Sequence, residues 1–284
     1  MKIGYRLKLL DTFAGIGGFS YAAEKLVGGF ETTQFVEIEP YCQKVLKKHW
    51  SHVPIHNDIK TFTAEPFQFD CISGGFPCQD ISNAGLQKGI TKNTRSGLFY
   101  ELIRIIRMVR PKYVVLENVA AITNRGLDIV LRELYESGYD AEWSVISASA
   151  LGACHQRARW WLVAYPDSKR SQRRMLQFNK ELQETGHIRQ KDTFSSSNTD
   201  STRTQSDRTR QAQPVWTNAF LNSKERRTIR RDWTGYVSEP CLCRGDDGLR
   251  GRMDRLKALG NAVVPQVAAI PMQRILDIEK NINK

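Results

Sequence analysis

Short apolar runs alternate with helical patterns through the first 165 residues, as they do in proteins that surround a sheet with helices. The runs rich in β-branched and aromatic residues predict strands at 8–13, 34–37, 69–73, 113–117 and 159–164. Apolar positions at helical spacing predict helices at 19–27, 40–49 and 98–109. This order indicates an α/β fold, in which the helices pack on the faces of the sheet.

The pattern changes after Pro166. Residues 167–254 are rich in Arg, Ser, Thr, Gln and Asn and have little apolar periodicity. We expect 195–210 to be disordered, because its composition cannot build a core. The aromatic residues between Trp216 and Tyr236 indicate that the later half of the segment folds or stacks on a partner.

Apolar periodicity returns close to the end of the chain. Residues 263–278 predict a helix that is interrupted by Pro271. The sequence therefore predicts a main domain from 1–165 plus 255–284, and a small irregular domain at 166–254.

The charge of the chain changes this picture. A formal charge of +12 and a pI of about 9.5 favour a polyanionic partner. Residues 167–254 hold 18 basic and 12 acidic side chains, so half of the excess charge lies in under a third of the chain. That distribution is typical of a module that faces nucleic acid.

Cysteine spacing and hydropathy exclude other classes of protein. The six cysteines lack the spacing of a zinc site, so we expect no metal and a reduced, cytoplasmic protein. No apolar run approaches the roughly 20 residues that cross a membrane. The first ten residues are too charged for a signal peptide.

A glycine cluster follows the first predicted strand, in the sequence Asp-Thr-Phe-Ala-Gly-Ile-Gly-Gly at 11–18. Glycines let a ligand approach the backbone closely, and the free amides of a helix start favour a negative group. Glu37 ends the second predicted strand, where a carboxylate can accept ribose hydroxyl groups. These features predict a nucleotide site that fits a nicotinamide cofactor as well as S-adenosylmethionine.

Three polar groups follow strand ends further along. Glycines precede Cys78 and polar residues follow it, so we expect its thiol to emerge into a cleft. Glu117-Asn118 ends an apolar strand, and a buried carboxylate there needs a partner or a task. Arg157 and Arg159 alternate before the last strand, so in an extended chain they project to the same side.

Taken together, these segments resemble the motifs of the bacterial and phage cytosine-C5 DNA methyltransferases of restriction-modification systems. The family patterns D-L-F-A-G-x-G-G, Pro-Cys before Gln, Glu-Asn-Val, Gln-x-Arg-x-Arg and R-x-x-x-x-G-N-x-V-x-P have counterparts at 11–18, 77–79, 117–119, 155–159 and 255–265. Thr12 replaces a leucine, and His155 stands where the family has Gln. The resemblance implies a Rossmann-like S-adenosylmethionine-dependent methyltransferase domain with a small, irregular target-recognition domain.

By this resemblance the cofactor is S-adenosylmethionine. Phe13 and Gly15 would line its methionine end, and Glu37 would hold the ribose. Ile38 would contact the adenine ring and Asp58 the adenine amine. The other cofactor-binding positions that the resemblance implies are Asp11, Ala14, Gly17, Gly18, Ile59 and Asn261.

The resemblance also assigns the catalytic roles. The Cys78 thiolate would attack C6 of a cytosine flipped out of double-stranded DNA, which makes C5 nucleophilic. Glu117 would contact the ring nitrogen N3, and Arg159 would hold the base carbonyl and favour the thiolate. Pro77, Asn118 and Arg157 complete the implied catalytic group.

DNA contacts are expected in two segments. A gate at 80–95 contains two glycines and is expected to close over the pocket. The basic segment would read the target sequence and neutralise phosphates. The candidate DNA-binding residues are Ser82, Gln87, Arg95, Arg226, Arg227, Arg230 and Arg231.

Three alternatives stay open from the sequence. A methyltransferase acting on RNA would share the fold, and an inactive DNA-binding protein could share the scaffold. A nicotinamide-dependent oxidoreductase explains the glycine turn but leaves Glu117-Asn118 and the paired arginines without a role. For the methyltransferase we expect a monomer, with a restriction endonuclease that acts on the same site without binding the enzyme.

Overall fold

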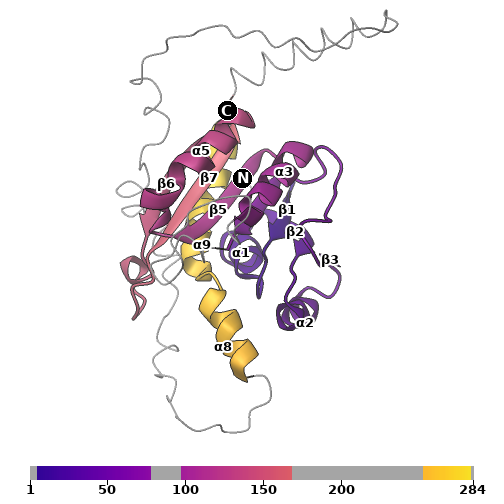
Figure 1. Ribbon diagram of the computed structural model, residues 1–284, viewed down its shortest axis with the longest axis vertical. Helices are drawn as coiled ribbons and strands as arrows, with labels where there is room; N and C mark the ends of the chain where they lie inside the picture. Colours follow the sequence, from indigo (N-terminus) through magenta and orange to yellow (C-terminus); the bar gives the residue numbers. More distant parts are fainter. Residues whose placement is uncertain (1–4, 78–96, 168–251, 283–284) are drawn as a thin grey trace, which may run out of the picture.

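The computed structural model describes residues 5–77, 97–167 and 252–282 (Figure 1). Several predictions fall outside these residues: the nucleophile Cys78, the gate at 80–95, the disorder at 195–210 and nearly all of the recognition domain at 166–254. The candidate DNA contacts Ser82, Gln87, Arg95, Arg226, Arg227, Arg230 and Arg231 also lie outside the described residues.

A seven-stranded sheet forms the centre of the described structure, in the order β3-β2-β1-β4-β5-β7-β6. The strands are β1 (Leu7–Thr12), β2 (Phe30–Val36), β3 (Ile55–His56), β4 (Cys71–Gly75), β5 (Tyr113–Val119), β6 (Tyr139–Ile146) and β7 (Arg159–Pro166). The first five are parallel, and β7 runs antiparallel between β5 and β6. The predicted α/β, Rossmann-like fold is confirmed.

The strand order reverses between β1 and β4. The chain builds outward from β1 to β3 and then returns to add β4 on the other side of β1. Thr12 at the end of β1 consequently pairs with Gly74 near the end of β4. Doubly wound sheets bind their ligands beyond the carboxyl ends of the strands at such a reversal.

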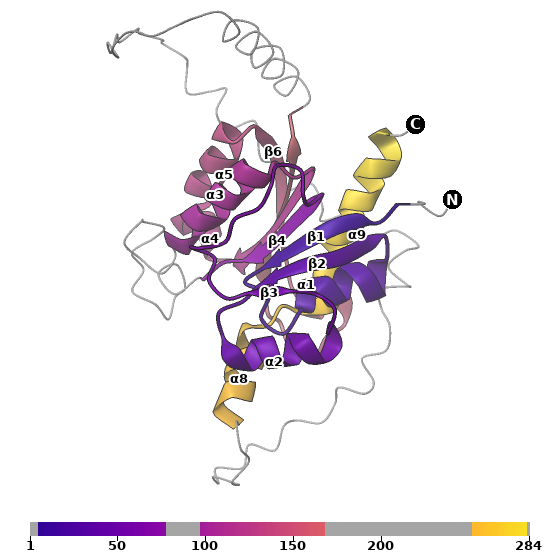
Figure 2. The ribbon, with the colours of Figure 1, turned by 90° about the vertical axis from the view of Figure 1, so that its right-hand side faces the viewer.

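Helices cover both faces of the sheet (Figure 2). They are α1 (Gly18–Tyr21), the π-helical η1 (Ala22–Val27), α2 (Pro40–His49), α3 (Leu98–Val109), α4 (Ile122–Arg125), α5 (Leu127–Glu136), the short 3₁₀ turn η3 (Ser149–Leu151), α8 (Arg252–Asn261) and α9 (Pro265–Ile282). Side chains of α3 and α5 bury one face, and those of α1, η1 and α9 bury the other. Among the described residues, no helix is long and apolar enough to cross a membrane.

The C-terminal helix α9 closes the second face although it is remote in sequence from its neighbours. Val267, Ala268, Ala269, Ile270 and Met272 are almost completely buried in one cluster with Phe19, Ala22 and Trp161. Pro271 is buried as well. The predicted interruption at Pro271 was wrong, because α9 runs continuously from Pro265 to Ile282. Burial of this face outweighs the backbone hydrogen bond that proline cannot donate.

Other element boundaries also differ from the prediction. The helix predicted at 19–27 is a short α-helix followed by a π-helical turn. Strand β2 begins at Phe30 rather than 34, and β4 covers 71–75 rather than 69–73. These shifts follow the pairing of each strand with β1, which a local sequence pattern does not contain.

Strand β6 was not predicted, because its sequence YDAEWSVI carries charged residues. Glu142 in this strand is only 5% exposed. Its carboxylate lies 2.6 Å from the Arg274 guanidinium of α9, which also donates a second hydrogen bond to it. The ion pair compensates the burial of this acid, and its partner is 132 residues away.

Candidate active site at the carboxyl ends of the strands

A tight turn joins β1 to α1 at the point where the strand order reverses. Phe13, Gly15 and Gly17 all have positive φ angles, of 51°, 54° and 84°. The Gly15 amide donates a 2.6 Å hydrogen bond to the Glu37 carboxylate at the end of β2. A Cβ atom added at Gly15 would meet nothing within 4 Å, so this side of the turn is open.

Two other glycines of the turn serve packing instead. A Cβ atom at Gly17 would lie 2.6 Å from the ring of Trp50, which is buried behind the turn. A Cβ atom at Gly18 would lie 2.5 Å from a methyl group of Val263, in the segment between α8 and α9. Ala14 is buried in the same small cluster as Trp50. The glycine turn is thus packed against Trp50 and Val263 at Gly17 and Gly18, whereas its side at Gly15 is open.

We expect Gly15→Ala and Gly17→Ala to fail in different ways. Gly17→Ala combines a strained left-handed backbone with an overlap on Trp50, and should lower the free energy of unfolding by about 2–4 kcal/mol. Gly15→Ala carries the backbone strain alone, about 1–2 kcal/mol, but its methyl group fills the open side. Denaturant unfolding and calorimetric titration with S-adenosylmethionine separate the two effects. Equal losses of stability in both variants would contradict this division of roles.

Asp11 lies behind the turn and has no exposed surface. Its carboxylate accepts hydrogen bonds from the Ser20 amide, the Ser20 hydroxyl and the Ser73 hydroxyl. Burial raises the pKa of Asp11 to about 7 despite these hydrogen bonds. The sequence predicted a cofactor contact here, but the side chain instead joins β1, β4 and α1 and has no face toward a ligand.

Glu37 and Ile38 form the second part of the site. The Glu37 side chain accepts hydrogen bonds from the amides of Gly15 and Glu39, and burial raises its pKa. Each carboxylate oxygen keeps capacity for a further hydrogen bond, as a ribose hydroxyl would need. Ile38 is 59% exposed, so an apolar side chain stands in solvent beside a buried carboxylate.

Asp58 and Ile59 lie in the turn that follows β3. One Asp58 carboxylate oxygen accepts a 3.0 Å hydrogen bond from the Lys60 amide, and the side chain is half-buried. Ile59 is 5% exposed and packs in the core. A ligand could therefore reach the Asp58 carboxylate and the backbone of this turn, but not the Ile59 side chain.

The catalytic candidates lie at the ends of β4, β5 and β7. Gly75 pairs with Glu117 across the sheet, and a Cβ atom at Gly75 would come within 3.1 Å of the Glu117 carboxylate. The Glu117 side chain is 13% exposed, and its Oε1 lies 3.1 Å from Nε of Arg159. Burial raises the pKa of Glu117 to about 7, because desolvation outweighs the attraction of Arg159 and Arg157. A carboxyl group in this state can give up a proton near neutral pH.

Asn118 faces away from this pair and is 2% exposed. Its amide nitrogen donates a 3.1 Å hydrogen bond to the carbonyl of Phe76, and its oxygen accepts one from the Val119 amide. Pro77 follows Phe76 and is the last residue described before Cys78. Asn118 thus holds the backbone that leads into the predicted nucleophile.

The sequence predicted an extended chain at Arg157 and Arg159, but the structure gives their guanidinium groups different partners. Arg157 has a φ of 35°, so the chain is not extended there. Its guanidinium donates to the carbonyls of Gly260 and Ala262, while Arg159 faces Glu117. Arg157 therefore connects the region of Glu117 to the segment 260–263. Val263 of this segment packs against Gly18 of the glycine turn. Asn261 is exposed at the end of α8, within this segment.

Sequence reasoning missed the residues that support the site. Ser20 and Ser73 bind Asp11, and Val263 and Trp50 occupy the space beside Gly17 and Gly18. The residue types Ser, Val and Trp do not by themselves indicate a role in a binding or catalytic site. The adjacency of Trp50 to a glycine of the turn could not be read from spacing alone.

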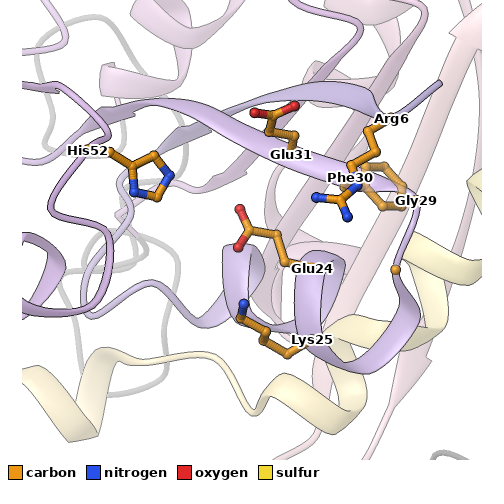
Figure 3. Close-up of a pocket in the computed structure, with 8 residues that line it drawn as sticks. Arg6, Glu24, Lys25, Gly29, Phe30, Glu31 and His52 are labelled. Atoms are coloured by element: carbon orange, nitrogen blue, oxygen red, sulfur yellow. The ribbon is translucent and has the colours of Figure 1, made fainter.

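A shallow hollow of about 270 Å³ lies away from this site (Figure 3). It is lined by Arg6, Glu24, Lys25, Gly28, Gly29, Phe30, Glu31 and His52, at the amino ends of β1 and β2. The Glu24 carboxylate there accepts hydrogen bonds from the Thr32 amide and from the indole of Trp50. The Glu24 carboxylate thus connects η1 to β2 and to Trp50.

The chain is similar to known DNA methyltransferases. The model of the C-5 cytosine-specific DNA methylase family matches residues 7–241. The chain is 39% identical over 160 residues to the type II methyltransferase M.CviJI of Paramecium bursaria Chlorella virus IL3A, covering 55% of this chain and 42% of that protein. It is 30% identical over 188 residues to the type II methyltransferase M.DsaV of Dactylococcopsis salina, covering 64% and 52%. The matches thus span about half the length of these relatives.

A Dnmt2 methyltransferase from S. pombe aligns with a TM-score of 0.48 and 23% sequence identity, over 57% of this chain and 51% of that one.

Proposed function

Because the chain belongs to the C-5 cytosine-specific DNA methylase family, we propose that it transfers a methyl group from S-adenosylmethionine to C5 of cytosine in double-stranded DNA. The observation that carries this proposal is the Glu117–Arg159 pair beside the end of β4. A buried carboxyl group with a pKa raised to about 7 and its paired guanidinium lie near the end of β4, after which the chain continues to Pro77.

The residues at the glycine turn fit the cofactor. The open face at Gly15 leaves room for the methionine end, and the Glu37 carboxylate is placed to accept ribose hydroxyl groups. The exposed Ile38 side chain offers an apolar surface to the adenine ring, and the Asp58 carboxylate offers an acceptor to its amine. When bound, S-adenosylmethionine supplies an electrophilic methyl group.

The proposed reaction begins with a bond from the Cys78 sulfur to C6 of a flipped cytosine. Glu117 gives a proton or a hydrogen bond to N3, which stabilises the electron-rich ring and makes C5 nucleophilic. Arg159 holds the base carbonyl and stays paired with Glu117. After C5 has gained the methyl group, removal of the C5 proton restores the C5–C6 double bond and breaks the bond from sulfur to C6. The proton on N3 returns to Glu117, which leaves neutral 5-methylcytosine and the Cys78 thiolate.

We infer the remaining assignments from the same family. The segment 166–254 would read the target sequence, with Arg226, Arg227, Arg230 and Arg231 as its candidate contacts, and Ser82, Gln87 and Arg95 would approach DNA from the gate. The enzyme would act in the cytoplasm as a monomer, beside a restriction endonuclease that cuts the same site. These assignments rest on the sequence alone.

The test is transfer of tritiated methyl groups from S-adenosylmethionine to mixed-sequence duplex DNA, with RNA of matching sequence in parallel. We expect label in 5-methylcytosine of the duplex and none in RNA. Label in RNA alone would replace the proposal by an RNA methyltransferase. Binding of cofactor and DNA without any transfer would favour an inactive DNA-binding protein.

A duplex with 5-fluorocytosine at the mapped target tests the covalent route separately. Fluorine cannot leave as the C5 proton does, so a stable complex of enzyme and methylated DNA should accumulate. Denaturing electrophoresis detects it as a shifted band that depends on S-adenosylmethionine. Turnover on ordinary DNA without any trapped complex on the fluorinated duplex would refute the bond to sulfur.

A further inference from the structure

Helix α3 makes a set of contacts that the proposed reaction does not use. The guanidinium of Arg104 donates hydrogen bonds to the carbonyl oxygens of Ile59, Lys60 and Phe62, at 2.8, 3.3 and 3.0 Å. A fourth contact, 2.7 Å from its Nε to the Glu101 carboxylate, fixes the direction of the side chain on its own helix. One side chain therefore binds three carbonyls within a four-residue segment that lies more than 40 residues away in the sequence.

The bound segment is the turn that carries Asp58. Within it the Asp58 carbonyl accepts hydrogen bonds from the amide and the hydroxyl of Thr61, and the Asp58 carboxylate accepts the Lys60 amide. The Ile59 side chain anchors the turn in the core. These local bonds fold the turn on itself, but the carbonyls on its outer side point to α3 and are satisfied by Arg104.

We propose that Arg104 is a positioning residue that fixes the Asp58 turn and so sets the affinity for the adenine end of S-adenosylmethionine. The inference rests on the proposed function, because it assigns the Asp58 turn to the adenine. Arg104 acts through backbone carbonyls, and Asp58 itself makes the contact with the ligand.

The geometry requires arginine at this position. A guanidinium has several donors in a rigid plane and can bind carbonyls that diverge, whereas a lysine ammonium is a single point of charge. Arg104→Lys keeps the charge next to Glu101 and the helix propensity, but cannot reach all three carbonyls. The turn then gains freedom that ligand binding has to remove, which weakens affinity.

Arg107 provides a matched control on the same helix. It donates to Glu133 and Ser137 of the α5 region and has no hydrogen bond to the Asp58 turn. We expect Arg104→Lys to raise the Kd and the KM for S-adenosylmethionine about tenfold, with kcat at saturating cofactor within about twofold of wild type. Arg107→Lys should leave all three values unchanged.

A double-mutant cycle on cofactor affinity separates positioning from general destabilisation. The losses from Arg104→Lys and Asp58→Ala should overlap, so that the double variant is weakened by less than the product of the single effects. The losses from Arg104→Lys and Glu37→Gln should multiply, because Glu37 lies in a different turn. Multiplicative losses in both cycles would overturn the inference.

The outcomes distinguish this inference from the proposed function. If wild type binds S-adenosylmethionine and Arg104→Lys binds it equally well, the positioning role is wrong and the methyltransferase proposal stands. If wild type does not bind S-adenosylmethionine, the proposed function fails and the inference falls with it. Calorimetric titration of the full chain with S-adenosylmethionine gives either answer without depending on turnover.

Discussion

Replacement of Cys78 by alanine is expected to abolish methyl transfer, with a loss of at least about 10⁴-fold in kcat. The alanine variant cannot form the bond to C6, and without that bond C5 of cytosine is too electron-poor to accept a methyl group. Binding of S-adenosylmethionine should stay within about twofold of wild type, because the glycine turn, Glu37 and Asp58 are unchanged. Methyl transfer to duplex DNA and calorimetric titration measure the two quantities side by side.

Cys154 is the matched control for this prediction. Its thiol is free and exposed, on a loop before β7. Cys42 and Cys71 are buried, and burial raises the pKa of both thiols, to about 11 for Cys42, so neither is poised to react. Cys154→Ala should methylate DNA as wild type does. Residual turnover in Cys78→Ala above about a thousandth of the wild-type rate would remove Cys78 from the mechanism.

The parts of the site that could be predicted from the sequence are those built from neighbouring residues. The glycine turn at 11–18 follows a β-rich run, and Glu37 and Glu117 each lie at or next to the end of another. In a parallel sheet such ends meet at one edge, so strand order alone brings these groups together. The chemistry of each side chain could then be read from its type.

The parts that could not be predicted depend on partners far away in the chain. Arg157 reaches carbonyls more than 100 residues later, and only the left-handed backbone at this position turns it there. Asn118 was assigned to catalysis by resemblance, whereas in the structure it holds Phe76, 42 residues earlier. Asp11 was assigned to the cofactor and instead binds Ser20 and Ser73 behind the turn. In each case the residue type could be read from the sequence, whereas the direction of the side chain could not be predicted from it.

Arg157 connects the catalytic end to the segment at 260–263, and that segment packs against Gly18 of the glycine turn. A continuous set of contacts therefore joins the two parts of the proposed site. These contacts favour the proposed reaction, because its rate depends on the distance between the bound methyl donor and the cytosine.

Glu117→Gln is expected to lower kcat by about 10²–10⁴-fold while leaving the fold and cofactor binding intact. Glutamine has nearly the same shape and can still donate a hydrogen bond to N3, but it cannot supply a proton. Arg159 also loses its charged partner at 3.1 Å, so the carbonyl of the base is held less firmly. Transfer rates at saturating DNA and S-adenosylmethionine measure the loss. A variant within about threefold of wild type would show that N3 needs no proton donor.

The pH dependence gives a sharper form of the same prediction. Burial raises the pKa of Glu117 to about 7, so the protonated acid is the major form below pH 7 and is lost as the pH rises through that value. The kcat/KM for DNA should therefore have a descending limb near pH 7, which Glu117→Gln should lack.

The raised pKa of Glu117 also affects folding stability. Between the usual carboxyl pKa of 4.5 and about 7 the folded state binds more protons than the unfolded state, so wild type loses stability as the pH rises through this range. Denaturant unfolding across this range should show a falling free energy for wild type and a flatter profile for Glu117→Gln, and parallel profiles would place the descending limb on another group.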